Sequence, residues 1–201
     1  MITDFSSLQT AIAAWTHRTD LTSVIPDFIG MAEKRMQVDL KVSELEKTGT
    51  ITTTSGNNTV TLPTDFSTLI AASLDSGGQT ITLDSMPLHI LLNQYGNSST
   101  GTPHSYALLN NSLVLGPTPA GALTITVRYA SNIPALSVSN TTNDVLTKYP
   151  DLYLYCCMVF AALFLQDDGL LQRYEAAYQQ AINAINNAEW SRHSPMTIKA
   201  A

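Results

Sequence analysis

Residues 149–192 read YPDLYLYCCMVFAALFLQDDGLLQRYEAAYQQAINAINNAEWSR, and this stretch decides the fold because it predicts two consecutive helices joined by a tight corner. Pro150 suits the first turn of a helix, where its missing N–H would be unpaired anyway, and Asp151 suits the positive end of the helix dipole. From Leu152 to Leu165 every residue is apolar or aromatic, which predicts a helix covered on all sides. These fourteen residues are fewer than the roughly 20 that cross a bilayer, so we expect a buried central helix rather than a membrane segment.

The residues after this apolar run predict the corner and the second helix. Gln166 to Gly169 interrupt the run with residues that suit helix caps. Apolar side chains then recur at three- and four-residue spacing, which predicts one packed face; they are Leu171, Tyr174, Tyr178, Ala181, Ile185 and Ala188. The other face carries mostly Gln and Asn, so it could equally meet another protein without burying an unpaired ion.

Composition bounds the class of protein. The chain has 201 residues, of which 44% are hydrophobic, so it can bury a core as one domain or as a domain with a sizeable insertion. Only 13% of the residues are charged, against about 25% in an ordinary soluble domain. Ten basic and sixteen acidic residues give a net charge of -6, which argues against gripping a phosphate backbone. The first residues lack the pattern of a cleaved signal peptide, so we expect synthesis in the cytoplasm.

Two further helices are predicted before residue 47. Asp4 can cap a short amphipathic helix whose apolar stripe is Phe5, Leu8, Ile12 and Trp15. Pro26 and Asp27 open a longer helix that ends near Leu40 or Val42. The inward stripe of that helix is Ile25, Phe28, Ala32 and Met36.

After Lys47 the composition changes to Thr, Ser, Gly and Asn with β-branched alternation, which predicts strands. The turn 55–58 predicts a hairpin of strands 50–54 and 59–62, and Gly77-Gly78 predicts a second hairpin of 69–74 and 80–83. Three more features are expected in order: a short helix at 86–95, a flexible run at 97–103 and a hairpin turning at Asn110-Asn111. The alternation in 123–129 predicts the clearest strand, and 131–148 is expected to return irregularly to the helices.

The expected fold class is therefore α+β. A helical bundle is formed by the N- and C-terminal helices, residues 1–47 and 135–192, with an antiparallel β-rich subdomain, residues 48–134, inserted between them. Residues 193–201 are expected to form a C-terminal arm.

No pattern in the chain predicts catalysis. His17, His89, His104 and His193 are isolated and lack the spacing of metal ligands, and no Gly-rich stretch has the spacing of a phosphate loop. Cys156 and Cys157 are adjacent within the apolar run, so they are better explained as packing thiols than as redox or metal groups. We expect no catalytic residue, no cofactor and no metal.

One carboxylate pair leaves an enzymatic alternative open. Asp167 and Asp168 are the only adjacent acids, and a cell-wall hydrolase could use such a pair if both faced one cleft. Their place at the start of a helix already explains them as caps. An enzyme is therefore not the expected class.

The chain ends in apolar and basic side chains with no core to bury them. The candidate partner-binding residues are Trp190, Arg192, Pro195, Met196, Ile198 and Lys199. A frayed terminus is one interpretation, since the last residues of most domains are loosely held. The alternative is an arm that orders in a partner's groove.

Five phrases, read in their order along the chain, resemble the head-to-tail adaptor proteins of tailed bacteriophages. They are IPDFIGMAEKRMQVDL (25–40), LPTDFSTL (62–69), PHSYALLNNSLVLGPTP (103–119), LTITVRYASNIPAL (123–136) and KYPDLYLYCCMVFAALFLQDD (148–168). The last is the most specific, because it combines the opening of the apolar helix with the acid pair that follows it.

The resemblance implies a structural virion protein without catalysis or cofactor. It implies a subunit of a dodecameric ring in the neck of the virion, docked under the portal protein and joined to a tail or nozzle protein. Genomic DNA would pass through the lumen without specific binding, and the C-terminal arm would reach toward the portal. Synthesis would take place in the host cytoplasm, and no membrane would be involved.

A binding module of another class remains open beside it. The Thr- and Asn-rich β insertion could belong to a carbohydrate- or receptor-binding tail module. Such a module would present clustered aromatic side chains on exposed loops, and the aromatic residues of the insertion are Phe66, Tyr95, Tyr106 and Tyr129.

Overall fold

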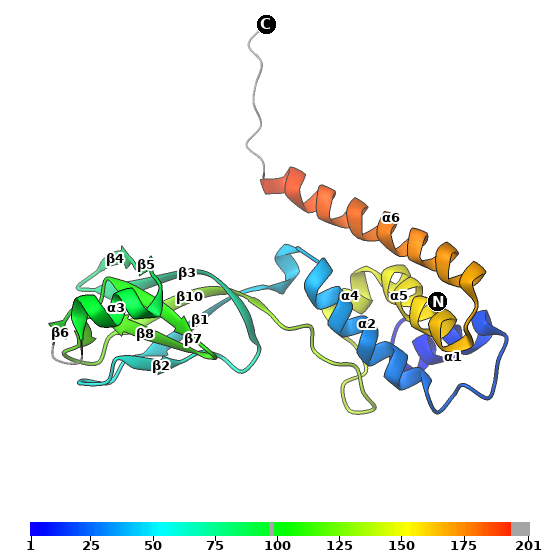
Figure 1. Cartoon of the computed structure of the whole chain (residues 1–201), viewed down its shortest axis with the longest axis horizontal. Coiled ribbons are helices and arrows are strands. Elements are labelled where there is room, and N and C mark those ends of the chain that lie inside the picture. The colour runs from blue at the N-terminus through cyan, green and yellow to red at the C-terminus, as the bar shows by residue number, and fades with distance from the viewer. Residues whose placement is uncertain (97–98, 194–201) are drawn as a thin grey trace, which may run out of the picture. The chain divides into compact units, whose positions relative to one another are not determined.

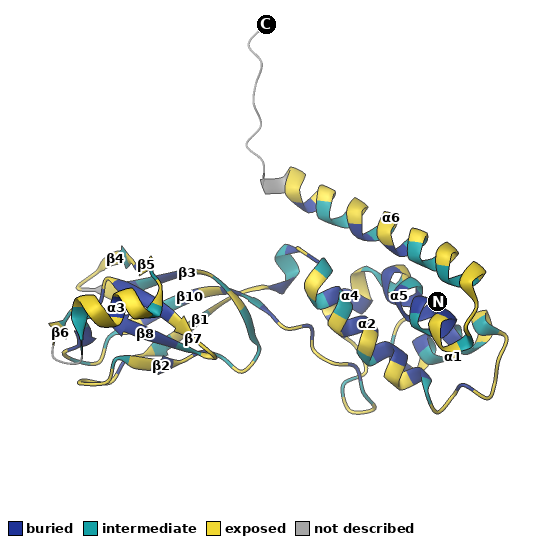
Figure 2. Cartoon of the chain, in the orientation of Figure 1, coloured by how far each residue is buried: buried dark blue, intermediate teal, exposed yellow. Residues whose placement is uncertain are grey.

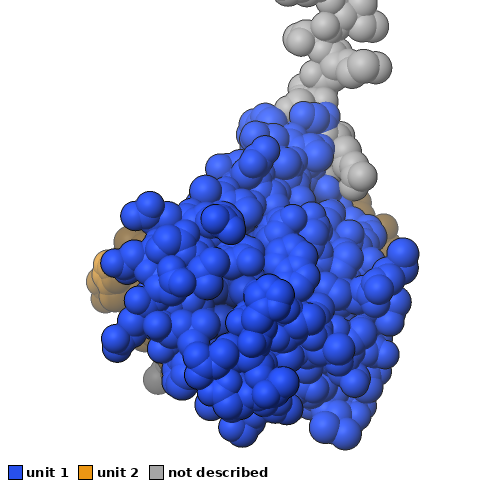
Figure 3. All heavy atoms as spheres, turned by 90° about the vertical axis from the view of Figure 1, so that its right-hand side faces the viewer, with its two compact units in different colours: residues 1–45, 133–201 blue, residues 46–132 orange. Residues whose placement is uncertain are grey.

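The structure, a computed structural model, describes residues 1–96 and 99–193, and the chain divides into two compact units. The helical unit comprises Met1–Leu45 and the chain from Ile133 onward, and the sheet unit comprises Glu46–Asn132 (Figure 1; Figure 3 gives them separate colours). The predicted α+β class is confirmed: helices from both ends of the chain form one unit, and an antiparallel β-rich subdomain is inserted between them.

The helical unit is built around one hydrophobic core. Its described elements are α1 (Phe5–Thr16), α2 (Ile25–Asp39), the 3-10 turn η1 (Ser43–Leu45), α4 (Asp144–Lys148), α5 (Pro150–Leu165) and α6 (Asp168–His193). The first two helices begin as the sequence predicts. The Asp4 side chain accepts the Ser7 N–H in a capping box, and Pro26 lies in the first turn of α2.

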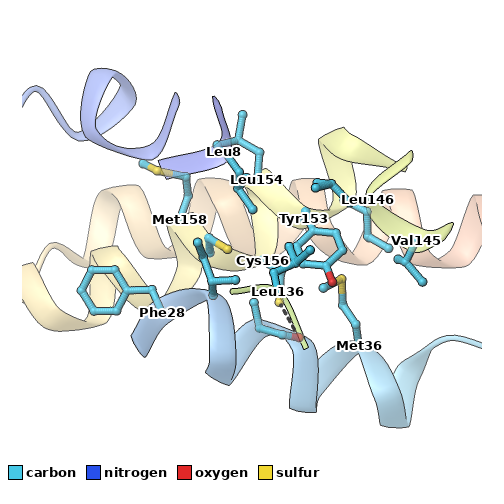
Figure 4. Close-up of a cluster of buried hydrophobic side chains, with 14 of the residues drawn as sticks. Leu8, Phe28, Met36, Leu136, Val145, Leu146, Tyr153, Leu154, Cys156 and Met158 are labelled. Carbon is cyan, nitrogen blue, oxygen red and sulfur yellow. Dashed lines mark hydrogen bonds between the residues drawn. The ribbon is translucent and has the colours of Figure 1, made fainter. Parts of the chain in front are cut away.

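The middle of this core is α5, which begins at Pro150 as predicted. Figure 4 shows the Tyr153 ring among Met36, Val145 and Leu146, side chains of α2 and α4. One part of the prediction is wrong, because α5 is not covered on all sides. Leu163 and Phe164, at its C-terminal end, are 51% and 56% exposed (Figure 2 colours burial).

The corner after α5 uses the predicted cap residues. Gln166 ends α5 in the left-handed conformation at φ 56°, and the Asp167 carboxylate accepts the Leu170 N–H at 2.9 Å to start α6. The packed face of α6 differs from the predicted stripe near its end. Tyr178, Ile182 and Glu189 are buried, whereas Ala188 is exposed.

In the described residues of the sheet unit there are two four-stranded sheets and one pair of short strands. The strands are β1 (Glu46–Thr52), β2 (Thr59–Thr61), β3 (Phe66–Ser76), β4 (Gln79–Thr82), β5 (Asp84–Ser85), β6 (Thr100–Gly101), β7 (Ser105–Leu109), β8 (Ser112–Gly116), β9 (Thr118–Pro119) and β10 (Thr124–Ser131). The orders are β1-β10-β3-β4, β2-β8-β7-β5 and β6-β9. Most pairs are antiparallel, and β5-β7 and β6-β9 are parallel. The inner faces share a core that includes Leu74, Leu113 and Ile125.

The predicted hairpin around residues 55–58 is wrong. β1 pairs with β10 and β2 pairs with β8, so the turn carries the chain from one sheet to the other. The Thr53 side chain explains this: its hydroxyl donates to the Gly121 carbonyl and accepts the Leu123 N–H, which ties β1 to the approach of β10. The β3-β4 and β7-β8 hairpins form as predicted, the latter with Asn110 at φ 52°.

Three short elements complete the comparison with the sequence. α3 (Leu88–Tyr95) ends at Gly96 as predicted. Thr100–Gly101, expected in a flexible run, forms β6, and Asp144–Lys148, expected in an irregular return, forms α4. The signal for α4 was present in the sequence, because Asn143 accepts the Leu146 N–H as an N-cap.

Candidate functional site

The candidate interaction features lie on the surface of the helical unit. A network of polar contacts holds α6 against α2 there. The Arg35 guanidinium of α2 donates to both carboxylate oxygens of Glu175 on α6, at 2.8 and 2.5 Å. The same guanidinium lies 4.5 Å from the centre of the Tyr178 ring, and the Tyr178 hydroxyl donates to Asp39 at 2.8 Å. Hydrogen bonding from Arg35 lowers the pKa of the Glu175 carboxyl. α6 is therefore held to α2 by charge-assisted bonds and by packing together.

The same contacts continue along α6 to the C-terminal end of α2. The Asn186 amide donates to the Asp39 carbonyl, and its oxygen accepts the Lys41 N–H, each at 2.9 Å. One turn later the Glu189 carboxylate accepts hydrogen bonds from Ser43. Amides that look like a solvent-facing stripe in the sequence thus satisfy the open backbone groups at the end of α2.

A second network holds the segment between Ile133 and Asn143 against the core. The Glu33 carboxylate accepts the Leu136 N–H at 2.8 Å and the Tyr153 hydroxyl at 3.3 Å. The Asn143 amide donates to that hydroxyl at 2.7 Å and to the Pro134 carbonyl at 2.8 Å. Burial raises the pKa of Glu33, because desolvation disfavours its charged form.

That segment forms one wall of an open groove of about 540 Å³. The groove is lined by Phe5, Ser6, Gln9, Pro26, Leu136, Ser137, Val138 and Thr141, none of which is charged. Val138 stands on its rim with 88% of its surface exposed. We refer to this feature as the 138 groove.

The turn that carries Val138 is held by its own hydrogen bonds. The Ser137 N–H donates to the Asn140 carbonyl, the Asn140 N–H donates to the Ser137 hydroxyl, and the Asn140 amide donates to the Ala135 carbonyl. The Phe5 N–H donates to the Thr141 carbonyl at 2.8 Å, which joins the turn to α1. The 138 groove is therefore preformed. Its residues come from three distant stretches, and no periodic pattern in the sequence brings them together.

The candidate arm falls largely outside the described residues. Trp190 is in α6 with 75% of its surface exposed. Arg192 belongs to the same helix, but its side chain lies outside the described part, and Pro195, Met196, Ile198 and Lys199 lie outside it altogether. The structure therefore places only Trp190 among the six predicted partner-binding side chains.

The histidines lie apart wherever the structure describes them. His17 ends α1 in the left-handed conformation, His89 is in α3, and the His104 ring packs edge-on against Tyr95 at 5.4 Å. Within residues 1–96 and 99–193, no three His, Cys, Asp or Glu side chains gather as metal ligands would. In the same part of the chain, each helix falls short of the length or the apolar content needed to cross a membrane.

Both cysteines are free and fully buried in α5. The Cys156 thiol points at the Ala32 carbonyl, 3.8 Å away (Figure 4). Burial raises the pKa of Cys156 to about 12 and that of Cys157 well above its ordinary value. Both thiols therefore stay protonated at neutral pH, which suits packing and not nucleophilic or metal chemistry.

The acid pair and the aromatic residues of the sheet unit can also be placed. Asp167 and Asp168 are both exposed at the corner between α5 and α6, where Asp167 caps α6. Tyr106 and Tyr129 are buried in the sheet unit, and Tyr129 donates to Asp65 at 2.9 Å. These tyrosines pack in the interior, so they are not the exposed aromatic cluster that a carbohydrate site would need.

The chain was compared with known protein families and with curated proteins. The family model described as SU10 adaptor protein matches residues 3–199, which is nearly the whole chain and includes both units. No curated protein matches the chain.

Proposed function

Because the chain belongs to the SU10 adaptor protein family of bacteriophages, we propose that it is a subunit of a head-to-tail adaptor ring. The ring, a dodecamer by resemblance, docks to the portal protein and connects the DNA-filled head to a tail or nozzle protein. The protein is then a structural component of the virion neck, made in the host cytoplasm, and has no catalytic role. The match from residue 3 to residue 199 is the observation that carries this proposal, since it assigns both units to an adaptor.

The surface of the helical unit supports the proposal. A ring subunit must bury surface against its neighbours without stranding ions, and the 138 groove is lined entirely by uncharged residues. The chain as a whole has only 13% charged residues. Trp190 adds an exposed aromatic side chain of the kind that often dominates binding energy at interfaces.

The charge of the chain supports passage of DNA without binding. A net charge of -6 on each subunit gives a ring whose field opposes that of phosphate, so DNA slides through instead of adhering. The protein alone should show no retention of double-stranded DNA at physiological salt in a filter or anisotropy assay. Retention that persists at that salt contradicts this part of the proposal.

Mixing the protein with the portal protein of its own phage tests the central claim. Native mass spectrometry should show one complex whose mass equals a portal ring plus a fixed number of adaptor chains. An adaptor that stays monomeric beside the assembled portal under several salt conditions contradicts the proposed function.

The arm can be tested in the same assay. We propose that Arg192 and the arm at residues 193–201 contribute to binding of the portal, with Arg192, Pro195, Met196, Ile198 and Lys199 as contacts. Truncation after Ser191 should then weaken the complex and leave the thermal stability of the protein unchanged. A truncated protein that binds the portal with unchanged affinity excludes this role.

A further inference from the structure

Trp190 is an apolar side chain that the helical unit leaves uncovered. It is 75% exposed, although α6 packs against the helical unit just before it, through Ile182 and Glu189. An exposed Trp whose ring is not packed within its own unit is a common anchor of a protein interface. Asn187 and Ser191, beside it on α6, are exposed and uncharged, and we refer to the Trp190 side chain as the knob.

The 138 groove is the matching concave feature of the same unit. Phe5, Pro26 and Leu136 give it apolar walls, and Ser6, Gln9 and Thr141 give it neutral polar edges. The Trp190 ring and the groove are both uncharged, so neither would bury an unpaired charge when the other covers it.

The knob cannot fill the groove of its own molecule. α2 has 15 residues and is therefore about 22 Å long. Pro26, in the groove wall, stands at its N-terminal end, whereas Asn186 and Glu189 hold α6 to its C-terminal end and to η1. Trp190 follows directly after those two residues in α6, so about the length of α2 separates it from Pro26 in the groove wall.

We propose that Trp190 of one copy packs into the 138 groove of a second copy. This inference rests on the proposed ring and names the surfaces by which its neighbours meet. Because the knob and the groove are different surfaces, the contact is head-to-tail and not two-fold symmetric, and a head-to-tail contact closes into a ring when its rotation allows. In this proposal Trp190 contacts a neighbouring subunit, whereas the arm that follows it contacts the portal.

Cross-linking between two single-cysteine variants of the full chain tests this contact. Ser191→Cys places a thiol beside the knob without removing Trp190, and Val138→Cys places one on the groove rim. Cys156 and Cys157 are fully buried and do not compete. A short bismaleimide added to an equimolar mixture, with one variant carrying a mass tag, should give a covalent heterodimer. Each variant alone should give none, since a head-to-tail contact brings unlike positions together.

Two controls sharpen the result. Val38→Cys replaces a valine that is 77% exposed on α2 and is absent from the groove lining, so its mixture with Ser191→Cys should not cross-link. Adding Trp190→Ala to Ser191→Cys should abolish the product with Val138→Cys. In native mass spectrometry the same substitution should raise the protein concentration needed for assembly by about 30-fold.

The possible failures are distinguishable. An assembly of defined mass in which the Ser191 and Val138 positions cross-link no better than the Val38 control contradicts the assigned contact and leaves the ring intact. An assembly unaffected by Trp190→Ala does the same. A chain that forms no assembly, with or without portal, contradicts the proposed function and the contact together.

Discussion

Glu33 on α2, and Glu175, which is paired with Arg35 of the same helix, contribute to stability with opposite pH dependence. Burial raises the pKa of Glu33 above its ordinary value near 4.5, so its neutral form is favoured in the fold. The stability that it contributes is present below that ordinary value and is lost as the pH rises through the raised pKa. Hydrogen bonding to Arg35 lowers the pKa of Glu175, and that contribution is present above the ordinary value and is lost as the pH falls.

Glu33→Gln should therefore gain in stability relative to the parent as the pH rises from 4 to 7. The amide oxygen can still accept from Leu136 and Tyr153, but it carries no charge to desolvate. Glu33→Ala should instead cost about 1–3 kcal/mol at every pH, because the buried Leu136 N–H loses its acceptor. Urea unfolding across this pH range measures the free energy of unfolding of both variants. A difference between Glu33→Gln and the parent that does not change with pH would contradict the prediction for Glu33→Gln.

Arg35→Gln should destabilise the protein by about 1 kcal/mol at pH 7, a modest value because the Arg35 and Glu175 side chains are 25% and 36% exposed. The cost should shrink at pH values below the lowered pKa of Glu175, where the carboxyl is protonated. Arg173→Gln, at an exposed position of α6, is the matched control and should change little. A cost that persists undiminished at pH 2 would mean that packing on Tyr178 dominates.

At the scale of the elements, Asp167 and Asp168 have different roles at the corner between α5 and α6. Asp167→Ala should cost about 1 kcal/mol, because the Leu170 N–H loses its cap. Asp168→Asn should cost less, since Asp168 is exposed in the first turn and acts only through the helix dipole. Thermal unfolding of the two variants measures both losses of stability. Equal losses would contradict the assignment of Asp167 as the cap.

At Gly116 the sheet lies close to two side chains of α3, Tyr95 and Leu91. A Cβ there would lie 2.4 Å from Tyr95 Cδ2 and 3.2 Å from Leu91 Cγ. Gly116→Ala should destabilise the sheet unit by about 1–3 kcal/mol through overpacking. Gly121→Ala, with nothing within 4 Å of its Cβ, is the matched control and should be neutral in urea unfolding.

The sequence predicts elements well where one local pattern decides them. Asp4, Pro26, Pro150 and the Asn110 turn all act within a few residues of chain, and each begins or ends its element as expected. The adaptor family was also recognisable from phrases of the chain. Local patterns account for these successes because caps and tight turns depend on neighbouring residues alone.

Apart from α4, whose N-cap Asn143 is local, the failures depend on distant residues. Residues 55–58 read as a hairpin turn, but Thr53 bonds to Gly121 and Leu123 and directs β1 to β10 instead. Glu189 is buried because Ser43 lies opposite it, which no periodicity reveals. The 138 groove likewise joins segments more than a hundred residues apart, so its shape is a property of the fold and not of any one stretch.

At the scale of the whole molecule, the division into two units, each with its own buried residues, predicts two unfolding steps. Trp15 and Trp190, the two tryptophans of the chain, are both in the helical unit, so their fluorescence reports that unit alone. Ile125→Ala, in the core of the sheet unit, should cost about 2–5 kcal/mol and shift a transition seen by circular dichroism. The midpoint seen by fluorescence should not move, and a joint shift would show that the units unfold as one.

The pairing of β1 with β10 puts the first and last strands of the sheet unit side by side, with Glu46 opposite Ala130. Opposed residues of such a ladder lie about 5 Å apart, so the chain leaves the sheet unit where it entered. A module whose two ends coincide can be lengthened, trimmed or replaced by another without displacing the helices that flank it.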